Sequence, residues 1–497
     1  MDRPMPSPRV RWYAGAGLLT LWGVATAIRW AHLDSVTLGS DSLGQFLAAW
    51  TVLSGGVPVP PNPEGGHSLW AWAIPCVALG RSLEGVFAVR FALGALVAPL
   101  GAMAAAAWSP PGRSRWLAGL LAGLILAWDP GLVDTLVVSF RGYGAPEFVA
   151  MALLGAGVGG RIGASVTAAA AIAATGQHPM AAGLGLGMLG LLGRWTRTEW
   201  RWALGVGVLA VLPRLVWLWS LGSCGAGLAE CLASVATGSA EPEVARLVML
   251  RRAFWDRFVV EMRPGASVAL ALGAGAALID KRTRSLGVVA LVGCAGVIAL
   301  GLVVQGFRPY HLRAVMPLMA VALAVSVGLR PWLLLGVGLS ISLGGIRWAA
   351  PPAPDGGVRG VDAVGRVVAT LDEPVQVEAA WFGDPVGLEP GAVVLSARQH
   401  GLSPARQLRA DGAGVVLLLV NLPDGSSVDG LVELDRTFSV LDDVAQRELD
   451  RVRILRASSL DEARGWLNDT TPPPVVVGGS FDWVKAFAPA ASDHRAL

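Results

Sequence analysis

Apolar runs of 17 to 25 residues recur through the first 350 residues of this 497-residue chain. A run of that length matches the hydrocarbon core of a bilayer, which is about 30 Å thick. Only 15% of the residues are charged, whereas an ordinary soluble protein carries about 25%. The sequence therefore predicts a polytopic integral membrane protein.

The membrane domain is expected to cover residues 1–349 and to be all-α, with about eleven transmembrane helices. The predicted spans are 12–31, 69–107, 116–130, 145–160, 162–176, 179–193, 202–221, 265–279, 285–305, 312–329 and 331–348. Segment 69–107, with apolar parts at 69–80 and 85–107, is either one bent or interrupted helix or a re-entrant piece plus a span, and it counts once. The first span follows a basic N-terminus and is expected to remain uncleaved.

Charge predicts the orientation, because short cytoplasmic loops are rich in Lys and Arg. The short basic loops hold Arg113 and Arg115, Arg161, Arg194 to Arg201, Lys281 to Arg284, and Arg330. Loop 32–68, on the other side, has no Lys or Arg. We expect an inner or plasma membrane protein with a cytoplasmic N-terminus. The outer segment 223–264 is the exception, and its five arginines are expected to lie along an interfacial helix.

The last 148 residues have a different composition. Residues 1–349 carry a net charge of +11 and residues 350–497 a net charge of −8. Strand-like runs at 375–381, 392–396, 414–420 and 475–478 alternate with helical periodicity at 358–371, 440–453 and 459–467. This alternation predicts a soluble α/β accessory domain. With eleven spans it lies outside the cytoplasm, beside or over the outer face.

The cysteine and glycine patterns do not indicate a catalytic or ligand-binding site. Cys76 and Cys294 lie in apolar spans as packing residues, while Cys224 and Cys231 are either a disulfide or two free thiols. The glycine-rich stretches lack the features of a nucleotide loop and indicate close helix packing. No metal-ligand cluster stands out, so we expect no metal and no cofactor. Nucleic acid is excluded as a partner because the basic residues sit mostly at helix ends.

Polar side chains gather on the predicted outer side. They include His32, Asp34, Asp41, His67, Asp129, Asp134, Arg141, Glu147, His178, Arg308, Tyr310, His311 and Arg313. Charged and imidazole groups are costly near membrane spans and often mark function. The pattern favours a polar active site at the outer boundary. A general tolerance of histidine and acidic residues for interfaces is the alternative.

Several of these residues belong to segments with a family resemblance. Residues 39–50 (GSDSLGQFLAAW) and 53–56 (LSGG) resemble the first outer loop of the GT-C-fold glycosyltransferases. These enzymes use polyprenyl-phosphate sugars and are related to protein mannosyltransferases and aminoarabinose transferases. Residues 175–179 (TGQHP) and 308–317 (RPYHLRAVMP) are similar to that family's layout. The resemblance spans roughly residues 10 to 330 and implies a lipid-linked sugar donor and an extracytoplasmic acceptor.

Sugar transfer from a lipid phosphate needs a base that takes the acceptor's proton. Asp41 is the first candidate and Asp34 the second. The alternative for Asp41 is helix capping, since Ser-Asp-Ser before an apolar helix is a good N-cap. The family's common acidic pair is here Asp41-Ser42, and this single carboxylate argues against a metal-dependent variant.

The departing phosphate needs cations and hydrogen-bond donors. Candidate phosphate ligands are Arg308, Arg313 and Arg141, because a planar guanidinium matches phosphate oxygens. The alternative for each is snorkelling toward lipid headgroups. His178 and His311 are candidate donors to phosphate or acceptor, or satisfied interfacial histidines. Tyr310 is either a further substrate contact or an interface anchor.

Three functions follow from this pattern. The leading hypothesis is a GT-C-type glycosyltransferase in which Asp41 promotes an inverting displacement at the anomeric carbon. Its partners are membrane lipids, a polyprenyl-phosphate-linked sugar and an acceptor that the sequence does not identify. A transporter or flippase of a lipid-linked substrate is the rival from another class. Charges near the midplane and internal repeats would favour it, but the charges lie at one boundary and no clear repeat is seen, so it ranks second. A non-catalytic scaffold with the same fold is the third.

Overall fold

A computed structural model describes the chain from residue 8 to residue 476 with gaps. The described residues are 8–32, 49, 52–53, 72–80, 83–133, 146–175, 195–222, 243–303, 309–348, 375–381, 415–421, 432–433, 453–458, 462, 465 and 475–476.

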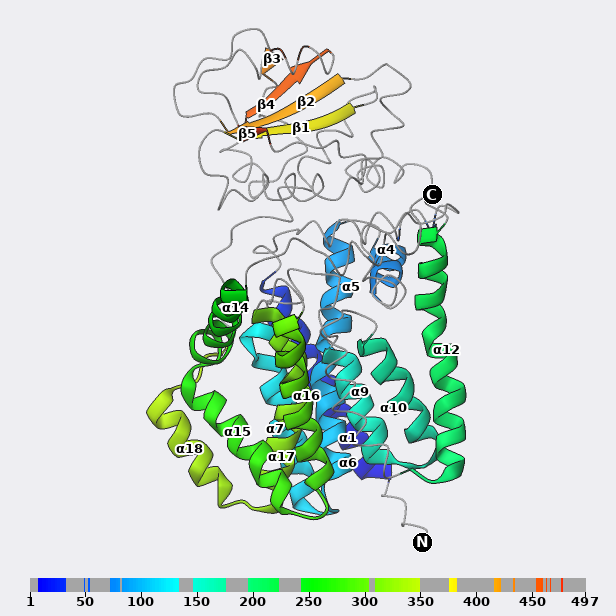
Figure 1. The fold of residues 1–497 in the computed structure, drawn as a ribbon, viewed down its shortest axis with the longest axis vertical. Coiled ribbons are helices and arrows are strands. Elements are labelled where there is room, and N and C mark those ends of the chain that lie inside the picture. Colours follow the sequence, from blue (N-terminus) through cyan, green and yellow to red (C-terminus); the bar gives the residue numbers. More distant parts are fainter. Residues whose placement is uncertain are drawn as a thin grey trace.

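Helices dominate the part before residue 349 (Figure 1). The first half holds α1 (Pro8–Trp30), α4 (Ile74–Gly80), α5 (Leu83–Ala95), α6 (Val97–Trp108), α7 (Arg113–Trp128), α9 (Pro146–Val158) and α10 (Gly160–Thr175). The second half holds α12 (Arg197–Gly222), α14 (Glu243–Trp255), the π-helix η5 (Asp256–Glu261), α15 (Pro264–Ile279), α16 (Arg284–Val303), the 3-10 helix η6 (Pro309–Val315), α17 (Met316–Leu329) and α18 (Leu333–Gly344). The chain is thus an all-α membrane protein in this part.

Helix lengths agree with a membrane location. The stretches Gly85–Trp108 and Leu312–Leu329 are each long and apolar enough to cross a bilayer. A third candidate is the pair Leu247–Glu261 and Pro264–Ile279, which is bent by 102°. The predicted span 179–193 lies outside the described residues, so the number eleven stays a prediction. Segment 69–107 is interrupted, with the short helix α4 packed beside α5.

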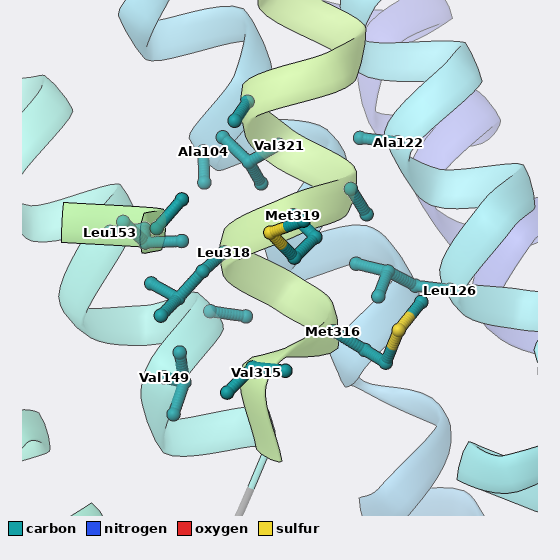
Figure 2. Close-up of a cluster of buried hydrophobic side chains, with 14 of the residues drawn as sticks. Ala104, Ala122, Leu126, Val149, Leu153, Val315, Met316, Leu318, Met319 and Val321 are labelled. Carbon is teal, nitrogen blue, oxygen red and sulfur yellow. The ribbon is translucent and has the colours of Figure 1, made fainter. Parts of the chain in front are cut away.

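Helix α17 forms the centre of the bundle and packs against α6, α7, α9, α15 and α16. Its side chains from Met316 to Gly328 are all buried. Figure 2 shows Val315, Met316, Leu318, Met319 and Val321 among Ala104 of α6, Ala122 and Leu126 of α7, and Val149 and Leu153 of α9. Small residues permit this close approach: a Cβ at Gly273 would overlap Leu323. Such small-residue contacts are typical of membrane helices.

The short loops that carry the arginines lie at one end of the bundle. The end of α17 lies close to the start of α7, since a Cβ added at Gly328 would be only 2.9 Å from the Ser114 carbonyl oxygen. Arg330 Nη1 donates to Ala276 O near the end of α15 (3.2 Å). Trp108 Nε1 donates to Leu153 O, and this joins the end of α6 to the middle of α9. We call this end, with loops 109–112, 280–283 and 330–332, the basic end.

A five-stranded sheet follows the helices, with strand order β3-β4-β2-β1-β5. The strands are β1 (Val375–Trp381), β2 (Val415–Asn421), β3 (Val432–Glu433), β4 (Arg453–Ala457) and β5 (Val475–Val476). Strands β1 and β2 are parallel, and the other pairs are antiparallel.

The described strands test only some of the predictions made for residues 350–497. Strands β1, β2 and β5 fall on predicted strand-like runs. The helical periodicity assigned to 440–453 is wrong at Arg453, because pairing with β2 draws that residue into β4. The run 392–396 and the predicted helix 358–371 lie outside the described residues, and of the predicted helix 459–467 only residues 462 and 465 are described, both as helical. An α/β domain over 350–497 therefore stays a prediction.

Candidate functional site

Buried charged side chains gather at the end of the bundle opposite the basic end. The fully or nearly buried ones are Arg29, Arg90, Asp129, Glu147, Arg257 and Arg313. They come from the end of α1, the start of α9, the C-cap of α7, and the short helices η5 and η6; Arg90 lies two turns into α5. Charges this deep in an apolar bundle are costly unless they are paired, so the partners of each side chain decide whether its burial is compensated.

Four of the side chains at this end form an alternating ion-pair chain, which we call the outer network. Arg257 Nη2 donates to both oxygens of Asp129 (2.8 and 2.9 Å), and its Nη1 donates to Glu261 Oε2 (2.9 Å). Arg313 Nη2 donates to Glu261 Oε1 (3.0 Å). Because every carboxylate oxygen of Asp129 and Glu261 accepts from arginine, these two acids hold the arginines in place.

Local backbone features set up this network. Asp129 is also the cap of the turn after α7, since its Oδ1 accepts from Leu132 N (2.8 Å). Gly131 leaves room for the arginine, because a Cβ there would overlap the Arg257 guanidinium. The π-helix η5 contributes both Arg257 and Glu261, and π-helical turns are frequent at functional sites. Arg263 follows with φ +76°, a strained value for a side-chain-bearing residue, at the bend into α15.

A second pair joins α5 to α9. Arg90 Nη1 lies 3.5 Å from Glu147 Oε1, and both side chains are almost fully buried. The Arg90 guanidinium carbon also lies 4.6 Å from the centre of the Trp72 ring, a cation–π distance. Trp72 in turn packs against Phe148, with ring centres 5.3 Å apart. Arg90 is therefore held from two sides.

Arg29 is the buried cation with the weakest compensation. Its side chain is fully buried in the last turn of α1. Nη1 donates to Ala25 O (2.9 Å), whereas Nε and Nη2 have no hydrogen-bond partner among the described residues. Arg29 lies within electrostatic range of Glu147 and Asp129, which are already paired with other arginines. Two buried N–H donors are thus available for an anion.

Arg313 is the predicted site residue whose side chain the structure describes. It is 8% exposed and bound to Glu261, so it does not extend toward lipid headgroups as the snorkelling alternative requires. Tyr310 and His311 lie in η6, but their side chains are outside the described set. Asp34, Asp41, Arg141, His178 and Arg308 lie outside the described residues, as do Cys224 and Cys231.

One prediction about the arginines of segment 223–264 is wrong. Arg251 and Arg252 are exposed on α14, as an interfacial helix requires, but Arg257 is fully buried. The physical reason is pairing with Asp129 and Glu261, which offsets the loss of hydration.

Several buried charges were not among the candidate site residues. The sequence pattern does not indicate Arg29, Arg90 or Glu261 as site residues, and it places Asp129 and Glu147 only within the polar set of the outer side. A usable signal existed for Arg29 and Arg90, since both sit toward the predicted outer ends of apolar helices, where the positive-inside rule disfavours arginine. Among the described residues, no group of three or more His, Cys, Asp or Glu is placed to hold a metal.

Comparisons with known proteins give fold similarity only. No family model matches the chain, and no curated protein matches it. It is similar to the crystal structure of ArnT from Cupriavidus metallidurans bound to undecaprenyl phosphate, with TM-score 0.49 and 15% identity over 80% of this chain and 73% of that one. For the apo state of the same protein the TM-score is 0.47 and the identity 17%, with the same coverage.

At these TM-scores and identities the two structures carry no argument about this chain, and the roles of individual residues rest on this chain alone.

Proposed function

We propose that this chain is a membrane glycosyltransferase that moves a sugar from a polyprenyl-phosphate donor to an extracytoplasmic acceptor. Asp41 is the general base and the anomeric carbon is inverted. The donor enters laterally from the bilayer, and the acceptor approaches from the aqueous side. Arg308, Arg141, His178, His311 and Tyr310 are the proposed contacts to phosphate and acceptor, together with Arg313. No metal or other cofactor is part of the proposal.

The surplus of buried positive charge at the outer network's end of the bundle carries this proposal. Four arginines are buried there among the described residues, against two buried carboxylates and the mostly buried Glu261. Arg29 has two guanidinium nitrogens, Nε and Nη2, without a partner among the described residues, whereas Arg90, Arg257 and Arg313 each lie at ion-pair distance from a carboxylate. A buried cation without a partner is strongly unfavourable. A phosphate would supply the missing charge and acceptors, and arginine is well suited to bind it.

Arg29 gives the first prediction. Arg29→Gln should weaken donor binding about 10- to 100-fold, the range of one or two lost charge-assisted hydrogen bonds. Arg29→Lys should recover only part of the loss, because an ammonium lacks the planar fork. The measurement is transfer from a polyprenyl-phosphate sugar in membranes as a function of donor concentration, which separates donor affinity from turnover.

Stability separates this role from a structural one. Removing an uncompensated buried charge should leave the thermal stability of Arg29→Gln unchanged or raised. Arg252→Gln, on the exposed face of α14, is the control and should transfer normally. A destabilised Arg29→Gln variant with normal donor affinity would make Arg29 structural. A wild-type chain that transfers nothing from any lipid-linked donor would overturn the proposed function itself.

Orientation gives the second prediction. We propose that the basic end faces the cytoplasm, that there are eleven spans, and that residues 350–497 form an α/β accessory domain on the outer side. Cysteines placed at Ser40 and at exposed Lys281, in a background without the four native cysteines, should react with a membrane-impermeant thiol reagent from opposite sides. Labelling of both from the same side would contradict the proposed topology and the outward-facing site.

A further inference from the structure

An apolar groove of about 620 Å³ lies toward the basic end, far along the helices from the outer network. Four helices line it, with Gly17 and Leu21 of α1, Met103 of α6, Trp116 and Leu120 of α7, and Val158 of α9. Its size falls within the range of small-molecule sites, about 300–1,000 Å³. Glycine leaves part of this space open: a Cβ added at Gly17 would meet no atom within 4 Å.

The groove has a chemical polarity along its length. Its walls are almost entirely aliphatic, and Leu120 is 58% exposed. Its end at the start of α7 carries Arg115, which is exposed and has no carboxylate at ion-pair distance among the residues described. Trp116 stands beside it, 56% exposed, and tryptophan is enriched at the headgroup level of membranes. An apolar channel that ends at a cation and an interfacial tryptophan matches an amphipathic anion.

We propose that this groove is a binding site for one anionic phospholipid of the adjoining leaflet. One acyl chain lies between α1, α6, α7 and the end of α9, and the lipid phosphate accepts hydrogen bonds from Arg115. The charge of the headgroup complements Arg115, and the acyl chain covers apolar surface that the described helices leave open. The site is separate from the proposed transfer chemistry, since it lies at the other end of the bundle.

The test uses the full chain, stripped of lipid by detergent exchange and then titrated with phosphatidylglycerol or phosphatidylcholine, with bound lipids counted by native mass spectrometry. The wild type should bind one phosphatidylglycerol tightly and prefer it to phosphatidylcholine. Gly17→Leu, which fills the groove, should weaken that binding at least about tenfold, and Arg115→Gln should remove the preference, as expected when a charge-assisted hydrogen bond is lost.

Matched controls come from the same helices. Gly15 is also open around its Cβ position but does not line the groove, so Gly15→Leu should bind like the wild type. Arg113 is exposed in the same turn as Arg115 and is not part of the groove, so Arg113→Gln should keep the preference. Equal binding by Gly17→Leu and Gly15→Leu, or an unchanged preference in Arg115→Gln, would overturn the proposal.

Labelling of the wild-type chain makes the test independent of variant folding. Phosphatidylglycerol with a diazirine in one acyl chain should attach to the groove walls, at residues such as Met103 and Leu120. Attachment elsewhere would overturn the proposed site. A tight site that takes polyprenyl phosphate but not phosphatidylglycerol would replace the proposed occupant. None of these readouts requires sugar transfer, so a failure here differs from a failure of the proposed function.

Discussion

Asp41→Asn is expected to reduce sugar transfer about 10²- to 10⁴-fold, the usual cost of losing a general base. The amide keeps nearly the shape of the carboxylate and most of its hydrogen bonds, but it does not accept the acceptor's proton. The measurement is the rate of transfer from a polyprenyl-phosphate sugar in membranes, normalised to protein amount. Donor affinity should change little, because the base acts on the acceptor.

The same substitution tests the capping alternative. Asn is as good an N-cap as Asp, so a capping role predicts normal stability and normal transfer. Asp34→Asn is the matched comparison from the same loop. Normal transfer by Asp41→Asn would remove Asp41 from the chemistry and make Asp34 the candidate base. If both variants transferred normally, the transporter and scaffold hypotheses would replace the enzyme.

Breaking the outer network should lower the free energy of unfolding more than the other substitutions do. Arg257→Met leaves the Asp129 carboxylate buried without its cation, and loss of one member of a buried ion pair costs about 3–5 kcal/mol. Asp129→Asn should cost less, because Arg257 keeps Glu261 and the amide oxygen can still accept from Leu132 N. The measurement is the free energy of unfolding of purified protein in mixed detergent micelles with increasing SDS.

A double substitution and a nearby pair provide the controls. Arg257→Met with Asp129→Leu should recover much of the lost stability, since an apolar replacement of both partners is often neutral. The Arg252–Asp256 pair, at 3.8 Å, is much more exposed, and exposed pairs contribute little. Arg252→Gln should therefore unfold like the wild type. An Arg257→Met variant as stable as Arg252→Gln would show that the network contributes no stability.

The helix positions were largely predictable because they depend on local composition. The predicted spans 116–130 and 265–279 coincide closely with α7 and α15, and the strand-like run 375–381 coincides with β1. Length and apolarity suffice here, since a bilayer requires runs of a fixed length whatever the neighbours are. At segment 69–107, composition left open a bent or interrupted helix and a re-entrant piece with a span. The structure shows separate helices α4, α5 and α6 there, with α4 packed on α5.

The buried charges could be predicted only in part. Asp129 and Arg257 are 128 positions apart, and nothing local to either residue indicates the pairing. Arg257 stands among five arginines of one segment, of which Arg251 and Arg252 are exposed. Only the approach of η5 to the C-cap of α7, with Gly131 leaving the space, separates the buried arginine from its exposed neighbours.

The sequence by itself determined that this is a helical membrane protein and where most described helices lie. It also predicted polar residues at the end opposite the basic loops, where the described ones, among them Asp129, Glu147 and Arg313, are found. Those properties follow from hydrophobic length and from charge, which act residue by residue. The tertiary structure decided which charges are buried, which pairs neutralise each other, and that Arg29 keeps two N–H groups without partners among the described residues. Pairing and burial depend on distances between helices that are remote in the chain, and only the packed bundle fixes those distances.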